Sequence, residues 1–209
     1  MRKLLESIVA AAQMALHLAL GPVLHRWRTR WGASRFERHC ALPGDDLVLR
    51  PAWSYTHAIG IDAPREAVWP WLAQIGQGRG GFYSYELLEN LAGCRIHNVL
   101  ELRPELQSLA VGDVVRLHGS GYGPPVARLE PGRTLVMGAE PDARGCGAVW
   151  GFHLLDGPNG TTRLVERGRS AVGRGPLERL AWGPYLLDPI GFVMSRKMLR
   201  TIKSLAEAS

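Results

Sequence analysis

The chain has 209 residues, enough for one well-buried domain with extensions, and its length does not require a second domain. Hydrophobic residues make up 46% and charged residues 21%, an ordinary globular composition without low-complexity runs or a fixed repeat, which excludes a repeat architecture. The net charge of +6 is carried almost wholly by arginine and is weak evidence for an anionic partner. Three widely spaced cysteines, Cys40, Cys94 and Cys146, argue against a disulfide framework and for the reducing cytoplasm.

The N-terminal stretch, residues 4–24, is the most apolar part of the chain. Its polar members Glu6, Gln13 and His17 fall within about 40° of one another when residues are placed at helical intervals. The pattern predicts a helix with a narrow polar stripe and a wide apolar face. Its length suffices for a membrane span, but the three polar groups and a glycine–proline pair near its end disfavour one. No small-x-small cleavage site follows, so a removed signal peptide is not expected.

A basic segment follows the apolar helix and contains Arg26, Arg28, Arg30, Arg35 and Arg38, with Trp27 and Trp31 between them. An apolar helix beside such a segment is typical of contact with an anionic membrane surface. The alternative is that the apolar face docks on the chain's own domain or on a second subunit, which would make a homodimer. We expect residues 1–40 to lie outside the ligand domain and to favour the membrane surface. No nucleic-acid motif accompanies the arginines, so nucleic acid is not an expected partner.

The domain body begins after a turn-rich loop, residues 43–51, which separates an N-terminal segment, residues 1–42, from a domain formed by residues 43–209. Residues 53–62 alternate between two faces and predict a half-buried strand. A helical pattern follows, with Pro64 in its first turn. Pro70 lies inside that pattern and is expected to kink or split the helix.

Gly76, Gly78 and Gly81 form a G-x-G-x-x-G frame. A dinucleotide fingerprint follows a strand and opens a helix, whereas Gly76 follows a helical pattern. The frame also lacks the G-K-[ST] ending of a P-loop. We interpret Gly76 as a helix stop and the remaining glycines as part of a mobile or tightly turned loop, so no nucleotide cofactor is expected.

A second helix is predicted from Tyr85, with Ser84 as its N-cap, to Gly93. Short alternating segments joined by turns then predict antiparallel strands, because the loops are too short for crossovers; they are residues 113–119, 125–140 and 147–171. Pro184 and Pro189 interrupt the chain before a C-terminal helix that is predicted from Ile190. The apolar stripe of that helix comprises Ile190, Met194, Met198, Ile202 and Leu205. The predicted class is α+β, with one face of the sheet buried under helices.

This order of elements resembles the helix-grip fold of the SRPBCC superfamily, which includes START-like and polyketide cyclase-like proteins. The segment AIGIDAPREAVWPWLAQIGQGRGGFYSYELLENLAGCRIH, residues 58–97, is similar to a bacterial branch of that superfamily without assigned chemistry. The resemblance covers roughly residues 43–206. It implies a curved antiparallel sheet around a long C-terminal helix, with a long hydrophobic cavity between them. It also implies binding, transport or sequestration of a hydrophobic small molecule or lipid without a cofactor, or a cyclase or dehydratase reaction on an apolar substrate.

The phase of the strands and the C-terminal stripe select the residues expected to meet a ligand: Tyr55, His57, Tyr83, Tyr85, Trp150, Phe152, Glu166, Met194 and Met198. Tyr83 and Tyr85 are expected at the mouth of the cavity. His57 and Glu166 are also the candidates for proton transfer, with structural hydrogen bonds or contact with the polar end of a ligand as the alternative. Cys94 and His97 have metal-ligand spacing but lack a second pair, so no metal is expected.

Overall fold

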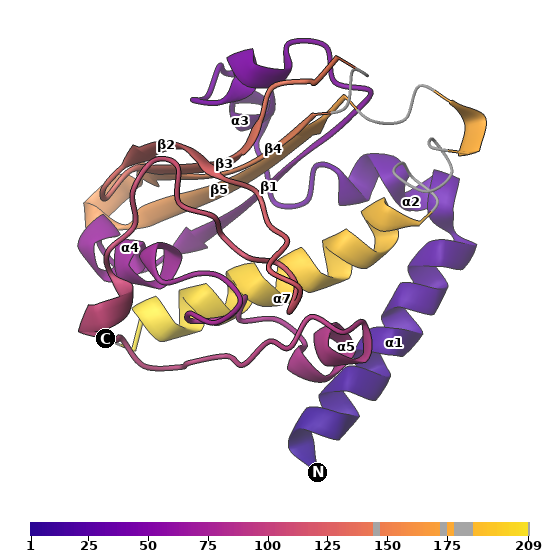
Figure 1. Ribbon diagram of the computed structural model, residues 1–209, viewed down its shortest axis with the longest axis horizontal. Helices are drawn as coiled ribbons and strands as arrows, with labels where there is room; N and C mark the ends of the chain where they lie inside the picture. Colours follow the sequence, from indigo (N-terminus) through magenta and orange to yellow (C-terminus); the bar gives the residue numbers. More distant parts are fainter. Residues whose placement is uncertain (144–146, 172–174, 178–185, 209) are drawn as a thin grey trace.

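The computed structural model describes residues 1–143, 147–171, 175–177 and 186–208. Figure 1 shows a curved antiparallel sheet with the long helix α7 packed against one face. The sheet has the order β1-β5-β4-β3-β2, with β1 Trp53–Ile61, β2 Val126–Glu130, β3 Thr134–Ala139, β4 Ala148–Asp156 and β5 Thr162–Ser170. The predicted α+β class is confirmed, and the arrangement fits a helix-grip fold.

The described helices are α1 Arg2–Ala19, α2 Gly21–Arg28, α3 Arg35–His39, α4 Arg65–Ala73, α5 Glu86–Leu91 and α7 Leu187–Ala206. Short 3-10 turns occupy Asp45–Val48, Pro104–Leu106 and Pro158–Gly160. The core lies between the sheet and α4 and α7, where Phe152, Leu164 and Ile202 are fully buried. This packing orients the inner face of the sheet toward α7.

The predicted strand at residues 113–119 is wrong. This segment forms only an isolated bridge between Val114 and Pro125, together with backbone bonds such as that from Leu117 N to Tyr122 O. The opposing chain contains Pro124 and Pro125, which have no N–H to donate, so a regular ladder cannot continue. The other two predicted regions each divide into a hairpin. In the first, Arg133 N donates to Glu130 O at 2.9 Å.

The helix boundaries differ from the sequence-based expectations. Helix α4 ends at Ala73 rather than at Gly76, and Pro70 lies inside it without splitting it. Ser84 does not cap α5, because its hydroxyl donates instead to the carbonyl of Met194 at 3.0 Å.

Helix α7 begins at Leu187, three residues before the predicted start. It includes Pro189 in its first turn, where a backbone N–H would have no acceptor within the helix, so proline costs no hydrogen bond there. The other proline expected to interrupt this region, Pro184, lies outside the described residues.

The glycine frame forms a closed, tightly turned loop. Gly76 and Gly81 exchange two backbone hydrogen bonds, and both have positive φ. A Cβ at Gly81 would lie 2.4 Å from Oδ1 of Asn98, which accepts from the backbone N–H groups of Phe82 and Tyr83. The glycines therefore serve local backbone geometry, in agreement with the tightly turned alternative.

The N-terminal segment packs against the rest of the chain. Arg28, at the end of α2, is buried and forms an ion pair of 2.7 Å with the buried Asp188 at the start of α7. The backbone N–H groups of Thr56 and Ala58, on the edge strand β1, donate to carbonyls of residues 29 and 31. Arg28, one of the arginines counted toward a basic surface, is therefore not on the surface.

No single helix in the described part of the chain is long and apolar enough to cross a membrane. Helices α1 and α2 together meet the requirements of length and composition, but the chain bends by 109° between them.

Candidate functional site

A buried carboxylate lies at the centre of the sheet face that α7 covers. Glu166, on β5, accepts hydrogen bonds from the hydroxyl of Tyr55 at 3.0 Å and the indole N–H of Trp150 at 2.8 Å, both at Oε1. Nδ1 of His57 lies 3.1 Å from Oε2. The hydroxyl of Ser195, on α7, contacts both carboxylate oxygens and lies 2.5 Å from Oε1. Strands β1, β4 and β5 and helix α7 thus meet at one side chain.

These donors fix the charge state of the carboxylate. Burial opposes ionisation of Glu166, but the hydrogen bond and charge of His57 and the hydrogen bonds from Ser195 and Trp150 outweigh it, so the pKa of Glu166 lies below its ordinary value. Burial, together with the Glu166 charge, raises the pKa of Tyr55 well above its ordinary value. An ionised carboxylate offers about four lone-pair sites, and four side chains already occupy those of Glu166.

A partly open hollow of about 210 Å³ lies beside this carboxylate, between the sheet, α5 and α7. We call it the α7 hollow. Its lining is mainly apolar and is formed by Tyr55, Phe82, Ser84, Glu89, Leu117, Trp150, Glu166, Gly191, Met194, Ser195 and Met198. A small number of polar groups in an apolar wall is the usual form of a ligand site.

Glu89, on α5, is the carboxyl in the α7 hollow that has capacity left. Its Oε2 is buried and has no hydrogen-bond partner among the described residues. Burial, assisted by the negative charge of Glu86, raises the pKa of Glu89 from 4.5 to about 7. At neutral pH the group therefore exists in both protonation states and can donate or accept a hydrogen bond.

His57 lies behind the α7 hollow rather than in its lining. The imidazole is buried, and the rings of Tyr55, Trp31 and Phe192 lie 4.4, 6.4 and 5.7 Å from it. Its Nε2 is buried without a hydrogen-bond partner in the described part of the chain. The structure thus brings His57 and Glu166 together, as a proton-transfer pair requires, but encloses the imidazole among aromatic rings.

The other predicted ligand contacts divide into two groups. Met194 and Met198 lie in the α7 hollow with Tyr55, Trp150 and Glu166. Phe152 is fully buried in the core.

The two tyrosines expected at the mouth lie elsewhere. Tyr83 is buried, and its hydroxyl donates to the carbonyl of Trp71 at 3.0 Å. Tyr85 lies in a separate groove between α1, α5 and α7, where the ammonium of Lys197 is 5.7 Å from the ring centroid. The residues that line the α7 hollow are instead their sequence neighbours Phe82 and Ser84.

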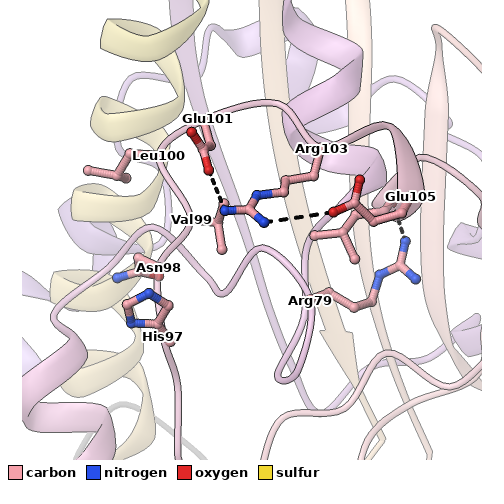
Figure 2. A pocket seen from close by; sticks show the side chains of 9 residues that line it. Arg79, His97, Asn98, Val99, Leu100, Glu101, Arg103 and Glu105 are labelled. Atoms are coloured by element: carbon pink, nitrogen blue, oxygen red, sulfur yellow. Dashed lines mark hydrogen bonds and ion pairs between the residues drawn. The ribbon is translucent and has the colours of Figure 1, made fainter.

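A second hollow, of about 590 Å³, is formed by the loop around residues 97–106 and is open to solvent. Figure 2 shows that its charged groups face one another, with the guanidinium of Arg103 between Glu101 and Glu105. Arg79 directs its guanidinium to backbone carbonyls, including that of Leu106. Apart from Nε of Arg79, which is buried without a hydrogen-bond partner among the described residues, these groups are already paired, so this hollow offers less to a ligand than the α7 hollow.

Cys94 and His97 do not form part of a metal centre in the described residues, where no three histidine, cysteine, aspartate or glutamate side chains cluster to hold an ion. Cys146 lies outside the described residues.

The chain is similar to several solved bacterial structures. Protein MLL2253 from Mesorhizobium loti is 19% identical, with 75% of this chain and 98% of that chain covered and a TM-score of 0.43. CalU16 from Micromonospora echinospora is 20% identical, with 74% and 84% covered and a TM-score of 0.34. Ms6760 from Mycobacterium smegmatis is 16% identical, with 74% and 91% covered and a TM-score of 0.42. No family model matches the chain, and no curated protein matches it. Likenesses this distant carry no information on function.

Proposed function

We propose that this chain binds a small amphipathic molecule in the α7 hollow. The apolar body of the ligand would lie against Phe82, Leu117 and the two methionines of α7, and its polar end would reach Glu89. The observation that supports this function is a mainly apolar hollow containing a carboxyl oxygen without a protein partner. A buried polar atom without a partner is costly, and a ligand group would satisfy it.

The size of the α7 hollow limits the ligand. Its volume of about 210 Å³ is below the roughly 300–1,000 Å³ of pockets for drug-sized molecules. In the described part of the chain, core side chains that include Leu135, Met137 and Phe152 are fully buried and packed between the sheet and the helices, where the superfamily resemblance implies a long cavity. A ligand of one or two rings or a short chain therefore fits better than a long lipid chain, although the flexible Met194 and Met198 can adapt to its shape.

Glu166 has a positioning role in this proposal. Its hydrogen bonds hold Tyr55 and Trp150 in the wall of the α7 hollow and connect the sheet to α7 through Ser195. A ligand donor at Glu166 would have to displace one of these protein donors. Glu89 needs no such exchange and is the better partner for the polar end.

A reaction on the bound molecule, of cyclase or dehydratase type, is the second candidate function. The pKa of about 7 at Glu89 favours it, because a general acid or base works best when its pKa is near the working pH. His57 would act only indirectly here, since its ring is enclosed behind the hollow. Loss of turnover in Glu89→Gln without loss of ligand binding would distinguish an enzyme from a binding protein.

The ligand-binding proposal can be tested at Gly191, in the wall formed by α7. A Cβ built on this helical glycine meets nothing within 4 Å, so a larger residue can be added without a clash. Gly191→Leu places a branched side chain at the hollow, whereas Gly191→Ala is the matched control that leaves most of the space. Both changes replace glycine in a helix and are expected to stabilise it by about 0.5–1 kcal/mol.

The probe is 2-naphthol, a fluorescent two-ring molecule with one hydroxyl group. We expect saturable binding to the wild-type protein and to Gly191→Ala, and binding at least tenfold weaker to Gly191→Leu. Native mass spectrometry of the gently purified protein would identify a natural ligand. The proposal fails if 2-naphthol does not bind saturably to the wild-type protein, or if Gly191→Leu binds it as well as Gly191→Ala does.

A further inference from the structure

Helix α1 directs Glu6, Ser7 and His17 toward the protein, together with Ala10 and Met14, and its leucine, isoleucine and valine side chains away from it. Glu6 forms an ion pair of 3.2 Å with Lys197 on α7, and Ser7 and His17 are buried. Every exposed residue between Leu4 and Leu20 is leucine, isoleucine, valine or alanine. Ile8 and Leu16 are 57% and 56% exposed. Figure 1 shows α1 at the periphery of the molecule, beside α5 and α7.

Exposed apolar side chains also occur on α2, which follows α1 after a bend of 109°: Val23 is 79% and Trp27 48% exposed. We call the exposed residues of α1 together with Val23 and Trp27 the α1–α2 apolar face. An apolar face of this extent is unusual in a monomeric protein and marks an interaction surface.

The exposed charged residues of the N-terminal segment are all of one sign. The exposed charged side chains described between Met1 and Pro43 are those of Lys3, Arg26, Arg30 and Arg35, and none of the exposed residues there is acidic. Arg26 and Arg30 flank the exposed Trp27. Tryptophan and arginine beside an apolar helix face are the residues that favour the interface of a membrane with water.

These charges also argue against a second copy of the chain as the occupant. A two-fold contact brings the same patch of both copies together, so it would place cations opposite cations. An anionic lipid headgroup instead offers an opposite charge to each arginine.

We propose that the α1–α2 apolar face docks on an anionic lipid surface, with α1 lying in the plane of the interface and the exposed arginines contacting lipid headgroups. This inference does not depend on the function of the α7 hollow. The contact requires no rearrangement of the inner face of α1, which stays packed against α7.

The experiment is co-sedimentation of the full chain with vesicles of phosphatidylcholine alone or of phosphatidylcholine mixed with phosphatidylglycerol. We expect binding to the mixed vesicles only, and weaker binding at high salt. The double variant Ile8→Gln, Leu16→Gln should bind at least tenfold more weakly. Its control is Leu102→Gln, Val111→Gln, which changes two exposed apolar residues outside this face. Each of Arg26→Gln and Arg30→Gln should weaken binding about fivefold, whereas Arg133→Gln should not.

The changed residues are exposed, so the variants should keep the wild-type melting temperature. Equal binding to both kinds of vesicle, or equal binding by Ile8→Gln, Leu16→Gln and its control, would overturn the proposal. Sedimentation equilibrium without lipid compares the oligomeric state of the wild-type protein with that of Ile8→Gln, Leu16→Gln. A wild-type dimer that becomes a monomer in Ile8→Gln, Leu16→Gln, together with no vesicle binding, would show that a second copy covers this face.

Discussion

The raised pKa of Glu89 makes a direct prediction for the pH dependence of stability. The folded-state pKa of about 7 lies above the ordinary value of 4.5, so the folded protein binds this proton more tightly than the unfolded chain does. The contribution of Glu89 to stability is therefore fully present below about pH 4.5, decreases as pH rises, and is lost once pH has risen through about 7. Glu89→Gln removes the titrating group and with it this pH dependence.

The magnitude follows from the size of the shift. Each pKa unit corresponds to about 1.4 kcal/mol, so ionising Glu89 in the folded protein costs at most about 3.5 kcal/mol. The side chain is only partly buried, and solvent screening reduces this to about 1.5–2 kcal/mol. Between about pH 5 and pH 8 the free energy of unfolding of Glu89→Gln should therefore rise by that amount relative to the wild-type protein.

Urea denaturation at several pH values measures this difference, and its pH dependence is informative whatever the absolute stability of the variant. Glu130→Gln, at an exposed position, is the control and should run parallel to the wild-type protein. Glu86→Gln should weaken the pH dependence, because the charge of Glu86 contributes to the shift at Glu89. Parallel curves for Glu89→Gln and the wild-type protein would refute the assignment of a raised pKa to this carboxyl.

Other substitutions test the parts of the fold that position the site. Arg28→Met leaves Asp188 buried without its arginine and should lower the free energy of unfolding by about 3–5 kcal/mol in urea titrations, with part of the loss recovered in the double variant Arg28→Met, Asp188→Leu. Gly81→Ala should destabilise the protein more than Gly78→Ala in thermal melts, because both positions have positive φ but only Gly81 also has Asn98 in contact. Ser195→Ala removes one donor to Glu166 and should cost about 1–3 kcal/mol, with a rise in the pKa of Glu166 that nuclear magnetic resonance titration would detect.

Hydrophobic periodicity predicted the strands of the sheet and which of their side chains share its inner face. Tyr55 and His57 share a strand phase with core residues, as do Trp150 and Glu166, and side chains that share a face of neighbouring strands meet there. Ser195 was missed because the apolar stripe of α7 was centred one residue away, on Met194 and Met198. A small polar residue beside such a stripe, opposite a predicted buried glutamate, is the signal that could have found it.

The α7 hollow could not be predicted in full, because its remaining wall comes from irregular backbone. Phe82 and Ser84 follow the glycine loop, and Tyr83 between them has a φ of 56°. Because of this positive φ, Phe82 and Ser84 rather than Tyr83 face the α7 hollow. Leu117 lies in the segment mistaken for a strand. Nothing in the sequence pattern marks Glu89, because its burial depends on packing between α5 and α7 that periodicity does not describe.

The orientation of the N-terminal helix α1 also could not be predicted from its sequence pattern. An amphipathic pattern defines two faces, and the usual assumption is that the apolar one turns inward. In α1 the side turned inward carries polar side chains beside Ala10 and Met14: Lys197 of α7 provides a partner for Glu6, and Phe192 and Trp27 lie against the ring of His17. With this side packed against α7, nothing on α7 covers the leucines of the opposite face. An amphipathic pattern that usually indicates a helix packed on a core therefore indicates, in α1, an exposed apolar surface that a membrane or another molecule would cover.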